Sequence, residues 1–397
     1  MAVKNLLANA ALALLGVAVS YAAFLAVLTV PFFQNHVIYL HSVTQTWGLD
    51  TNFPEQWGFL RNQVTPFHIR TSDGEVLHAW HVLPLQLYTE NEDGLLKEPK
   101  GLASDINERL SYKLLREDPD SLLVIYLHGA GGTLGSGWRP PSYRAMSAAA
   151  PRRIHTVAID YRGFGASTGS PSEAGLLQDA LALAEWAVEE AGIPPSRIVL
   201  FGQSIGTAVC VSLAHHLAHL PEPVFFSGMV LVAPFADVEL LTATYRVAGT
   251  VPILGPVAKL PGLLSYLNSF IESKWPSKDK LAGFVRAGEA VIGHGDTYRI
   301  TLIHSEDDSS IPWAHSDALF WHAVNASLPD GWGQDDLNME KATKRMDRGA
   351  GGWMFKRKTQ GGWIKEEILK YGFHDRIMSY PAVSRAVADA FGSHIDE

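Results

Sequence analysis

Cysteine is almost missing from this 397-residue sequence, in which Cys210 is the single example. One thiol excludes an internal disulfide framework and any metal site built from cysteines. The formal net charge of −9 is modest and gives no support to a nucleic-acid partner. We expect Cys210 to be a small packed residue, because no neighbouring group would lower the pKa of its thiol.

Charge is missing altogether from residues 5–49, and nearly every residue from 6 to 33 is apolar or small. At about 1.5 Å per residue, such a helix would cross a hydrocarbon core of roughly 30 Å. We therefore predict one membrane-spanning helix in an N-terminal anchor of residues 1–35. A signal peptide cleaved at Ala18-Val-Ser20 is the alternative, but the apolar run exceeds the usual length of about 7 to 15 residues. A helix buried in a globular core is disfavoured because the run is apolar on all sides.

The few positive charges near this helix predict its orientation. Lys4 and the amino terminus precede the helix, and the next basic residue is Arg61. By the positive-inside rule the amino terminus stays in the cytoplasm, and the rest of the chain lies in the lumen of the endoplasmic reticulum or outside the cell. The glycosylation sequon Asn325-Ala-Ser327 agrees with that side of the membrane.

The rest of the chain alternates between apolar runs and helical patterns. We interpret residues 36–64 as a juxtamembrane segment and residues 65–397 as one large domain. Continuous apolar runs predict buried parallel strands at residues 122–127, 156–159, 229–232, 299–303 and 363–370, with another ending just before Ser204. Helical spacing predicts helices over about 173–190, from Ser204 to about 219, and over 381–391. The alternation predicts an α/β fold with a mostly parallel central sheet and helices on both faces.

Three segments interrupt this alternation. Residues 85–118 are charged and irregular, and we expect a surface insertion there. Residues 238–296 are rich in Leu, Val, Gly and Pro; we interpret them as a cap, whose apolar side chains would line an acyl-binding cleft or pack as an ordinary subdomain. Residues 328–362 are Gly-rich and basic, and we expect a second surface insertion, either solvated or touching anionic headgroups.

The pattern Gly202-Gln-Ser-Ile-Gly206 stands between an apolar strand and a helical stretch. Two glycines leave room for a strained backbone that lifts the hydroxyl of Ser204 clear of the sheet. The N-terminus of the following helix favours negative charge at the same place. A buried turn is the alternative, but the placement between strand and helix favours a nucleophile at Ser204.

A serine hydroxyl needs a base to take its proton and an acid to orient that base. Asp308 follows the strand after the cap, and His374 follows the last predicted strand. The carboxyl ends of parallel strands meet at one edge of a sheet, where ligands bind in open α/β folds. We therefore predict that Ser204, Asp308 and His374 converge there as nucleophile, acid and base, in an order that is known for one α/β scaffold.

Other residues compete for these roles. For the acid, they are Asp307, Glu306 and the more distant Asp237. For the base, they are four histidines: His304 precedes the acid, His315 and His322 follow it without an intervening strand, and His394 lies in the C-terminal tail. His215 and His219 are four residues apart on one helix, as metal ligands can be, but no carboxylate motif accompanies them. We expect no metal and no organic cofactor.

A second turn of small residues, His128-Gly-Ala-Gly-Gly132, follows a buried strand. Small residues let backbone N–H groups face a developing oxyanion, and the amides of Ala130 and Ile205 are the predicted pair. A tight structural turn or a phosphate cradle is the alternative. A dinucleotide site is disfavoured because Leu134 stands where that fingerprint needs its third glycine.

Together these motifs resemble the α/β-hydrolase family over roughly residues 65–395. The matching segments are the two turns above, Asp160-Tyr-Arg-Gly-Phe-Gly165, His304-Ser-Glu-Asp-Asp308 and Gly372-Phe-His374. The anchor and the acidic motif before Ile311-Pro312 are similar to the branch of membrane-anchored monoacylglycerol and lysophosphatidylserine lipases of the endoplasmic reticulum. This resemblance also favours Asp308 over Asp307. The insertion at 328–362 and Ala130, where relatives often carry Asn, depart from the pattern and bear on substrate choice.

The resemblance and the residues together predict a membrane-anchored serine hydrolase that cleaves lipid esters of the monoacylglycerol or lysophospholipid type. Its partners would be a lipid ester substrate and the bilayer, with the catalytic domain in the lumen of the endoplasmic reticulum. A thioesterase or peptidase with the same three residues is an alternative, as is a membrane-tethered binding protein without catalysis. The oligomeric state is left open.

Overall fold

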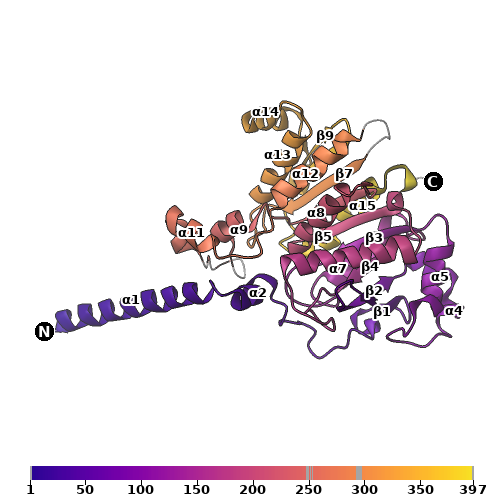
Figure 1. Cartoon of the computed structure of the whole chain (residues 1–397), viewed down its shortest axis with the longest axis horizontal. Coiled ribbons are helices and arrows are strands. Elements are labelled where there is room, and N and C mark those ends of the chain that lie inside the picture. Colours follow the sequence, from indigo (N-terminus) through magenta and orange to yellow (C-terminus); the bar gives the residue numbers. More distant parts are fainter. Residues whose placement is uncertain (1, 247–249, 251, 253, 292–296, 396–397) are drawn as a thin grey trace.

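A ten-stranded sheet forms the centre of the molecule (Figure 1). The computed structural model describes residues 2–246, 250, 252, 254–291 and 297–395. The order of the strands is β1-β2-β4-β3-β5-β6-β7-β10-β9-β8. Their bounds are Val64–Arg70 (β1), Val76–Val82 (β2), Leu122–Leu127 (β3), Ile154–Ile159 (β4), Ile198–Gln203 (β5), Gly228–Val232 (β6), Tyr298–Ser305 (β7), Met346–Asp347 (β8), Trp353–Lys358 (β9) and Gly362–Leu369 (β10).

The six central strands, from β4 to β10, pair in parallel, and the strands at both sides pair antiparallel. Their side chains alternate between two cores: in β5, Leu200 packs into one apolar cluster and Val199 and Phe201 into another, on the opposite face. Because both faces are buried, the sequence of these strands is continuously apolar. The predicted strands and the mostly parallel sheet are confirmed.

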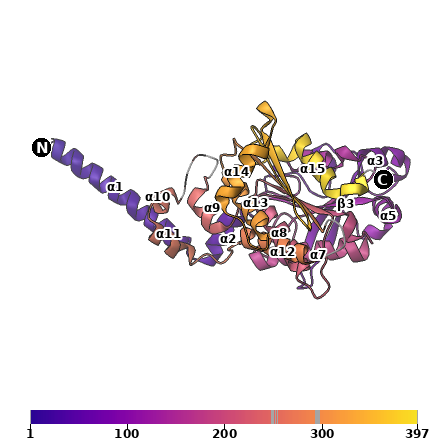
Figure 2. The ribbon, with the colours of Figure 1, turned by 90° about the horizontal axis from the view of Figure 1, so that it is seen from above.

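Helices cover both faces of the sheet (Figure 2). α7, α8 and α12 lie on one face, and α6 and α15 on the other. The bounds of the helices are Ala2–Val27 (α1), Pro31–Tyr39 (α2), Leu85–Glu90 (α3), Glu92–Leu95 (α4), Leu110–Glu117 (α5), Arg139–Met146 (α6), Glu173–Glu185 (α7), Ile205–Ala218 (α8), Val238–Thr244 (α9), Gly255–Ala258 (α10), Pro261–Asn268 (α11), Ser277–Ala290 (α12), Ala314–Ala326 (α13), Gln334–Lys344 (α14) and Pro381–Phe391 (α15).

The N-terminal helix α1 extends away from the rest of the molecule (Figures 1 and 2). Residues Val3–Val27 are long and apolar enough to cross a membrane, and none of the most apolar stretch is buried against the protein. The helix stops before Pro31, which begins the separate helix α2. A packed core helix would bury its apolar side chains, whereas the apolar stretch of α1 is not buried against the protein.

The predicted cap at 238–296 divides into two parts. Helices α9, α10 and α11 lie beside α2, at the end of the molecule from which α1 emerges (Figures 1 and 2). Helix α12 instead packs against α8 and α13 and covers the sheet. Residues 247–249, 251, 253 and 292–296 of this segment lie outside the described part of the chain.

The two expected surface insertions are more ordered than their composition suggests. Residues 85–118 were expected to be irregular, but they contain α3, α4 and α5, because Leu87, Tyr88 and Leu95 form a small apolar cluster. Within 328–362, β9 extends the sheet beside β10. The ammonium of Lys341 is buried between the carboxylates of Asp317 and Glu366. These ion pairs tie the second segment to the core.

Candidate active site

Ser204 lies at the sharp turn between β5 and α8. Its backbone has φ 53° and ψ −122°, a strained conformation for a residue with a side chain. The two flanking glycines are required by close packing rather than by their own φ angles. A Cβ on Gly206 would lie 2.0 Å from the carbonyl oxygen of Leu127, and one on Gly202 would lie 2.5 Å from that of Gly206. The strand, the turn and the helix therefore pack too tightly for any other residue at these positions.

Asp308 and His374 form a hydrogen-bonded pair after neighbouring strands β7 and β10. His374 Nδ1 donates to Asp308 Oδ2 over 2.7 Å. Burial opposes ionisation of Asp308, but the charge of His374 and the hydrogen bonds from His304 and His374 hold the pKa of this carboxyl well below its ordinary range. Burial also opposes a charged imidazole, yet the charge and hydrogen bond of Asp308 raise the pKa of His374. In this pair Asp308 stays ionised and stabilises a protonated His374, as the acid does for the base of a catalytic triad.

The rivals of Asp308 are engaged elsewhere. Asp307 accepts a hydrogen bond from the backbone N–H of Phe373 over 2.8 Å and so holds the loop that carries His374. Glu306 forms an ion pair with Lys370. Asp237 begins α9 by accepting from the N–H of Leu240.

Gln203 connects the serine turn with the histidine loop. Its side-chain amide donates to the carbonyl of His374 over 3.3 Å and to Asp375 Oδ1 over 3.1 Å. Because Gln203 directly precedes Ser204, these bonds place the histidine loop beside the serine turn. Asp308 thus binds His374 directly, and Gln203, the neighbour of Ser204, binds the loop that carries this histidine. Among the described residues no hydrogen bond joins the hydroxyl of Ser204 to His374 itself, so the complete set of three remains a prediction.

His304 forms a second hydrogen bond to Asp308, and the sequence did not indicate this contact. Its Nε2 lies 3.0 Å from Asp308 Oδ2 and 2.9 Å from the carbonyl oxygen of Ile311. Two acceptors require a proton on Nε2, and Nδ1 can then accept from the hydroxyl of Ser316 at 2.8 Å. The only signal in the sequence was its position four residues before Asp308 within the acidic motif.

The turn predicted to hold the oxyanion lies against the serine turn. A Cβ on Gly129 would lie 3.2 Å from the Cβ of Ser204, so the two turns are in contact. Ile205 is the first residue of α8, where a helix leaves its N–H groups without an intrahelical partner. The amide of Ala130 donates to no acceptor among the hydrogen bonds of the described residues. Both predicted donors are therefore available.

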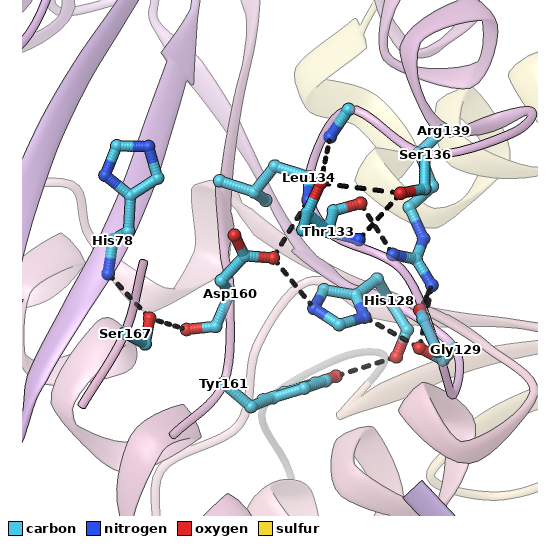
Figure 3. Close-up of polar contacts among 12 residues, drawn as sticks. His78, His128, Gly129, Thr133, Leu134, Ser136, Arg139, Asp160, Tyr161 and Ser167 are labelled. Atoms are coloured by element: carbon cyan, nitrogen blue, oxygen red, sulfur yellow. Dashed lines mark hydrogen bonds and ion pairs between the residues drawn. The ribbon is translucent and has the colours of Figure 1, made fainter. Parts of the chain in front are cut away.

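Arg139 organises this turn from its inner side (Figure 3). Its buried guanidinium donates to the carbonyls of Thr133 (2.6 Å), Gly129 (2.8 Å) and Gly131 (2.6 Å), and more weakly to that of Ala130 (3.4 Å). Gathering the carbonyls on one side leaves the N–H groups of the turn to face the other. Sequence reasoning missed Arg139, because a lone arginine in a helix gives no sign of which backbone it will meet.

The motif that begins at Asp160 holds the same turn from a second direction (Figure 3). Asp160 Oδ1 accepts from the N–H of Leu134 over 2.9 Å and lies 3.5 Å from His128 Nε2. Tyr161 donates its hydroxyl to the carbonyl of His128. Burial, helped by the charge of Arg139, lowers the pKa of His128, which keeps this imidazole neutral. These residues therefore support the turn beside Ser204.

The segment after α2 also binds this turn. The N–H of Gly131 donates to the carbonyl of Tyr39 over 2.8 Å, and that of Gly132 to the carbonyl of Val43 over 2.5 Å. Ser136 donates its hydroxyl to the carbonyl of Thr44 over 2.8 Å. The residues that follow the predicted anchor are therefore part of the site's supporting structure.

The other residues considered in the sequence, a cysteine, two histidines and the asparagine of the sequon, are packed or already bonded within the fold. Cys210 is buried in α8, and burial raises the pKa of its thiol. His215 and His219 stack on each other, and within the described ranges no group of three or more His, Cys, Asp or Glu side chains is arranged to hold a metal. Asn325 of the sequon lies in α13 and accepts a hydrogen bond from the N–H of Trp332, so its side chain is already engaged.

A strained serine after a central strand, at the same sheet edge as a hydrogen-bonded histidine and aspartate, defines the class of α/β hydrolases. The sequence profile of the alpha/beta hydrolase family matches residues 124–350, and this chain belongs to that family. A crystal structure of an α/β hydrolase from Vibrio vulnificus has the same fold, with a TM-score of 0.51 and 17% identity over 91% of this chain and 92% of that one.

Among curated proteins, the chain is similar to the lysophosphatidylserine lipase ABHD12 of Danio rerio, with 26% identity over 303 residues. That alignment covers 76% of this chain and 69% of the relative. Protein ABHD12B of Homo sapiens is 28% identical over 265 residues, which cover 66% of this chain and 62% of the relative. The ABHD12 lipase of Xenopus tropicalis is matched over 48% of its length. The chain thus spans between about half and about two thirds of these relatives.

Proposed function

We propose that this protein is a membrane-anchored serine hydrolase that cleaves lipid esters. The observation that carries the proposal is the 2.7 Å bond from His374 Nδ1 to Asp308 Oδ2, on a loop that Gln203 ties to the strained turn of Ser204. In this proposal residues 1–35 are the anchor, 36–64 the juxtamembrane segment and 65–397 the catalytic domain, with the cap and the insertion at 328–362 as additions to it.

The reaction begins at Ser204. Its Oγ attacks the ester carbonyl carbon while His374 Nε2 takes the hydroxyl proton, and Asp308 stabilises the imidazolium that forms. The carbonyl oxygen becomes an oxyanion, which accepts hydrogen bonds from the amides of Ala130 and Ile205. Such donors act strongly because they are already oriented when the charge develops.

The intermediate then collapses. The bond to the leaving alcohol breaks, and His374 gives its proton to the alcohol oxygen, leaving an acyl group on Ser204. Water attacks this acyl-enzyme by the same route, with His374 taking its proton and returning one to Ser204 Oγ as the fatty acid leaves. The balance needs only the ester and one water.

A monoacylglycerol or lysophospholipid is the substrate that the relatives and the anchor favour. The relatives of known substrate are named for lysophosphatidylserine, and α1 would keep the site beside a substrate that resides in the bilayer. Lys4 and the amino terminus favour a cytoplasmic start of the chain, and in this proposal the catalytic domain therefore lies in the lumen of the endoplasmic reticulum.

Activity-based labelling of the purified full-length protein tests this proposal. A fluorophosphonate probe should label the native protein and fail to label Ser204→Ala, and a panel should show hydrolysis of monoacylglycerols or lysophospholipids. Labelling that persists in Ser204→Ala would overturn the role of this serine. Turnover of acyl thioesters or peptides with no turnover of lipid esters would keep the three residues and overturn the substrate class.

A further inference from the structure

Helices α11 and α2, with the residues at their ends, carry large apolar side chains that stay exposed in the described part of the chain. On α11 and its ends these are Leu260, Leu263, Tyr266 and Phe270; on α2 they are Phe32, Phe33 and Val37. Tyr266 is 61% exposed and Phe32 64%. Large apolar side chains exposed together on two joined helices mark an interaction site. We call these seven residues the apolar platform.

The platform is not an accident of loose packing, because the opposite side of each helix is firmly held. On α11, Asn268 is buried and accepts a hydrogen bond from Thr242 of α9. On α2, Gln34 and Tyr39 are buried. Each of the two helices therefore buries polar side chains and exposes apolar ones. A helix on the surface of a soluble core does the opposite.

Direct hydrogen bonds join the two helices into one unit. Gln34 donates its amide to the carbonyl of Phe270 over 2.8 Å, and its Oε1 accepts from the N–H of Glu272 over 3.3 Å. The hydroxyls of Tyr39 and Ser273 are 2.8 Å apart. The end of α11 must therefore lie at the same depth relative to a membrane as α2.

The lengths of α1 and of the linker after it limit how far from the membrane α2 can lie. The 25-residue apolar helix spans about 38 Å, which exceeds a hydrocarbon core of roughly 30 Å. Residues 28–30 then connect α1 to α2, and three residues reach at most about 10 Å. Together the excess of about 8 Å and the linker keep the start of α2 within about 18 Å of the hydrocarbon core, whose headgroup region is about 5–7 Å thick, so α2 begins in or near that region.

The composition of the platform fits that surface. No Asp, Glu, Lys or Arg occurs in α2 or α11, whereas Phe, Leu and an amphipathic Tyr are typical of helices that lie in the interface. Figures 1 and 2 both show α11 near α2, at the end of the molecule from which α1 emerges. A second copy of the chain would find the same face obstructed by the membrane into which α1 extends.

We propose that the apolar platform lies in the outer part of the bilayer next to α1, so that the cap rests on the leaflet that holds the substrate. The location of the platform depends on α1 spanning the membrane, and its value for substrate capture rests on the proposed function. The cap also reaches the site, since the N–H of Arg246 donates to the carbonyl of Ser310 beside Asp308. A lipid leaving the bilayer at α11 would thus enter under the segment that borders the active site.

Depth measurements on the full-length protein test the location. Cys210 is buried and its thiol has a raised pKa, so a fluorophore attached to an introduced cysteine will report one position. Labels go on Leu263→Cys (platform), Leu14→Cys (middle of α1) and Glu117→Cys (far end, on α5), in nanodiscs that hold one copy each. Lipids with brominated chains should quench positions 14 and 263 roughly twofold or more and leave 117 unchanged.

Each outcome decides a different statement. Quenching at 14 without quenching at 263 would overturn the platform and leave the anchor intact. No quenching at 14 would overturn the anchor, and the platform with it. If 263 is unquenched by lipid but self-quenched in discs with two copies, the occupant is a second chain and the platform's assignment to lipid is wrong.

A pair of variants tests substrate capture. Leu263→Gln combined with Tyr266→Ser should slow hydrolysis of a bilayer-resident lipid ester about tenfold, while hydrolysis of a water-soluble short-chain ester stays at the native rate. Ser265→Gln, on the other side of α11, is the matched control and should change neither. Equal loss on both esters would overturn the capture role. If the native protein hydrolyses neither ester, the proposed function fails and the depth measurements still stand.

Discussion

Arg139 donates a 2.6 Å hydrogen bond to the carbonyl of Gly131, in the turn whose Ala130 amide is proposed to hold the oxyanion. Gly131 in turn donates its N–H to the carbonyl of Tyr39. One glycine is thus fixed from the inside by a buried guanidinium and from the outside by the segment that follows the anchor. The position of this proposed oxyanion donor therefore depends on residues that take no part in the proposed chemistry.

Replacing Arg139 should therefore lower turnover through the geometry of the turn. We expect Arg139→Met to reduce kcat roughly 100-fold with a small change in KM, because the donor is displaced in the transition state. Arg139→Lys, which can still donate to some of the carbonyls, should recover part of that loss. A fall in Tm with unchanged kcat for the folded fraction would contradict this positioning role.

The pH dependence of catalysis should report the His374–Asp308 pair. His374 must be neutral to accept the serine proton, so kcat/KM should fall as pH decreases through its pKa, which Asp308 raises above the ordinary value of about 6.5. Asp308→Asn removes the charge that stabilises the imidazolium. It should move this limb of the profile to lower pH and reduce kcat by roughly 10⁴-fold. An unchanged limb in Asp308→Asn would assign the titration to another group.

Packing at the serine turn should make Gly206 intolerant of a methyl group. A Cβ there would lie 2.0 Å from the carbonyl oxygen of Leu127, which is backbone and cannot move aside cheaply. We expect Gly206→Ala to lower the free energy of unfolding by about 3 kcal/mol or more in denaturant titrations. Gly262, with nothing within 4 Å of its Cβ position, is the control. Gly262→Ala should cost nothing, since alanine favours the helix.

Two truncations should separate anchoring from support of the site. Deleting residues 1–27 removes α1 and keeps the bonds from Tyr39 and Val43 to the turn, so hydrolysis of a soluble short-chain ester should be near native. Deleting residues 1–46 also removes those bonds and should lower kcat roughly tenfold or more. Circular dichroism and Tm report whether each form is folded. Equal activity in the two truncated proteins would show that the segment after α2 does not position the turn.

Local patterns predicted most of the architecture. The strand, turn and helix around Ser204 were readable because tight packing demands glycine on both sides of the serine, and this demand appears in five consecutive residues. The buried strands were readable because both of their faces are covered. The composition of 328–362 was less informative. Its Gly and basic residues indicated a surface insertion, although the segment contains strand β9 and the buried Lys341.

The sequence predicted the candidate residues of the site and their order along the chain, but not the side chains that hold them in place. Strand ends indicated Asp308 and His374, and the resemblance favoured Asp308 over Asp307. In the structure Asp308 binds the imidazole, while Asp307 binds the N–H of Phe373. The side chains of His304 and Arg139 act on atoms that only the fold brings near them. Nothing in the residues around Gln34 indicates that it will bind the cap more than two hundred positions later in the chain.

The sequence by itself determined the class of fold, the apolar helix at the amino terminus and the three residues proposed for catalysis, because each of these depends on the chemistry of a short stretch. The tertiary structure alone decided what holds the turn that is proposed to bind the oxyanion, what supports Asp308 beside His374, and that the cap is bound to the helix after the anchor. These are contacts between distant segments, and their free energy depends on the distance between atoms that no short stretch of sequence specifies.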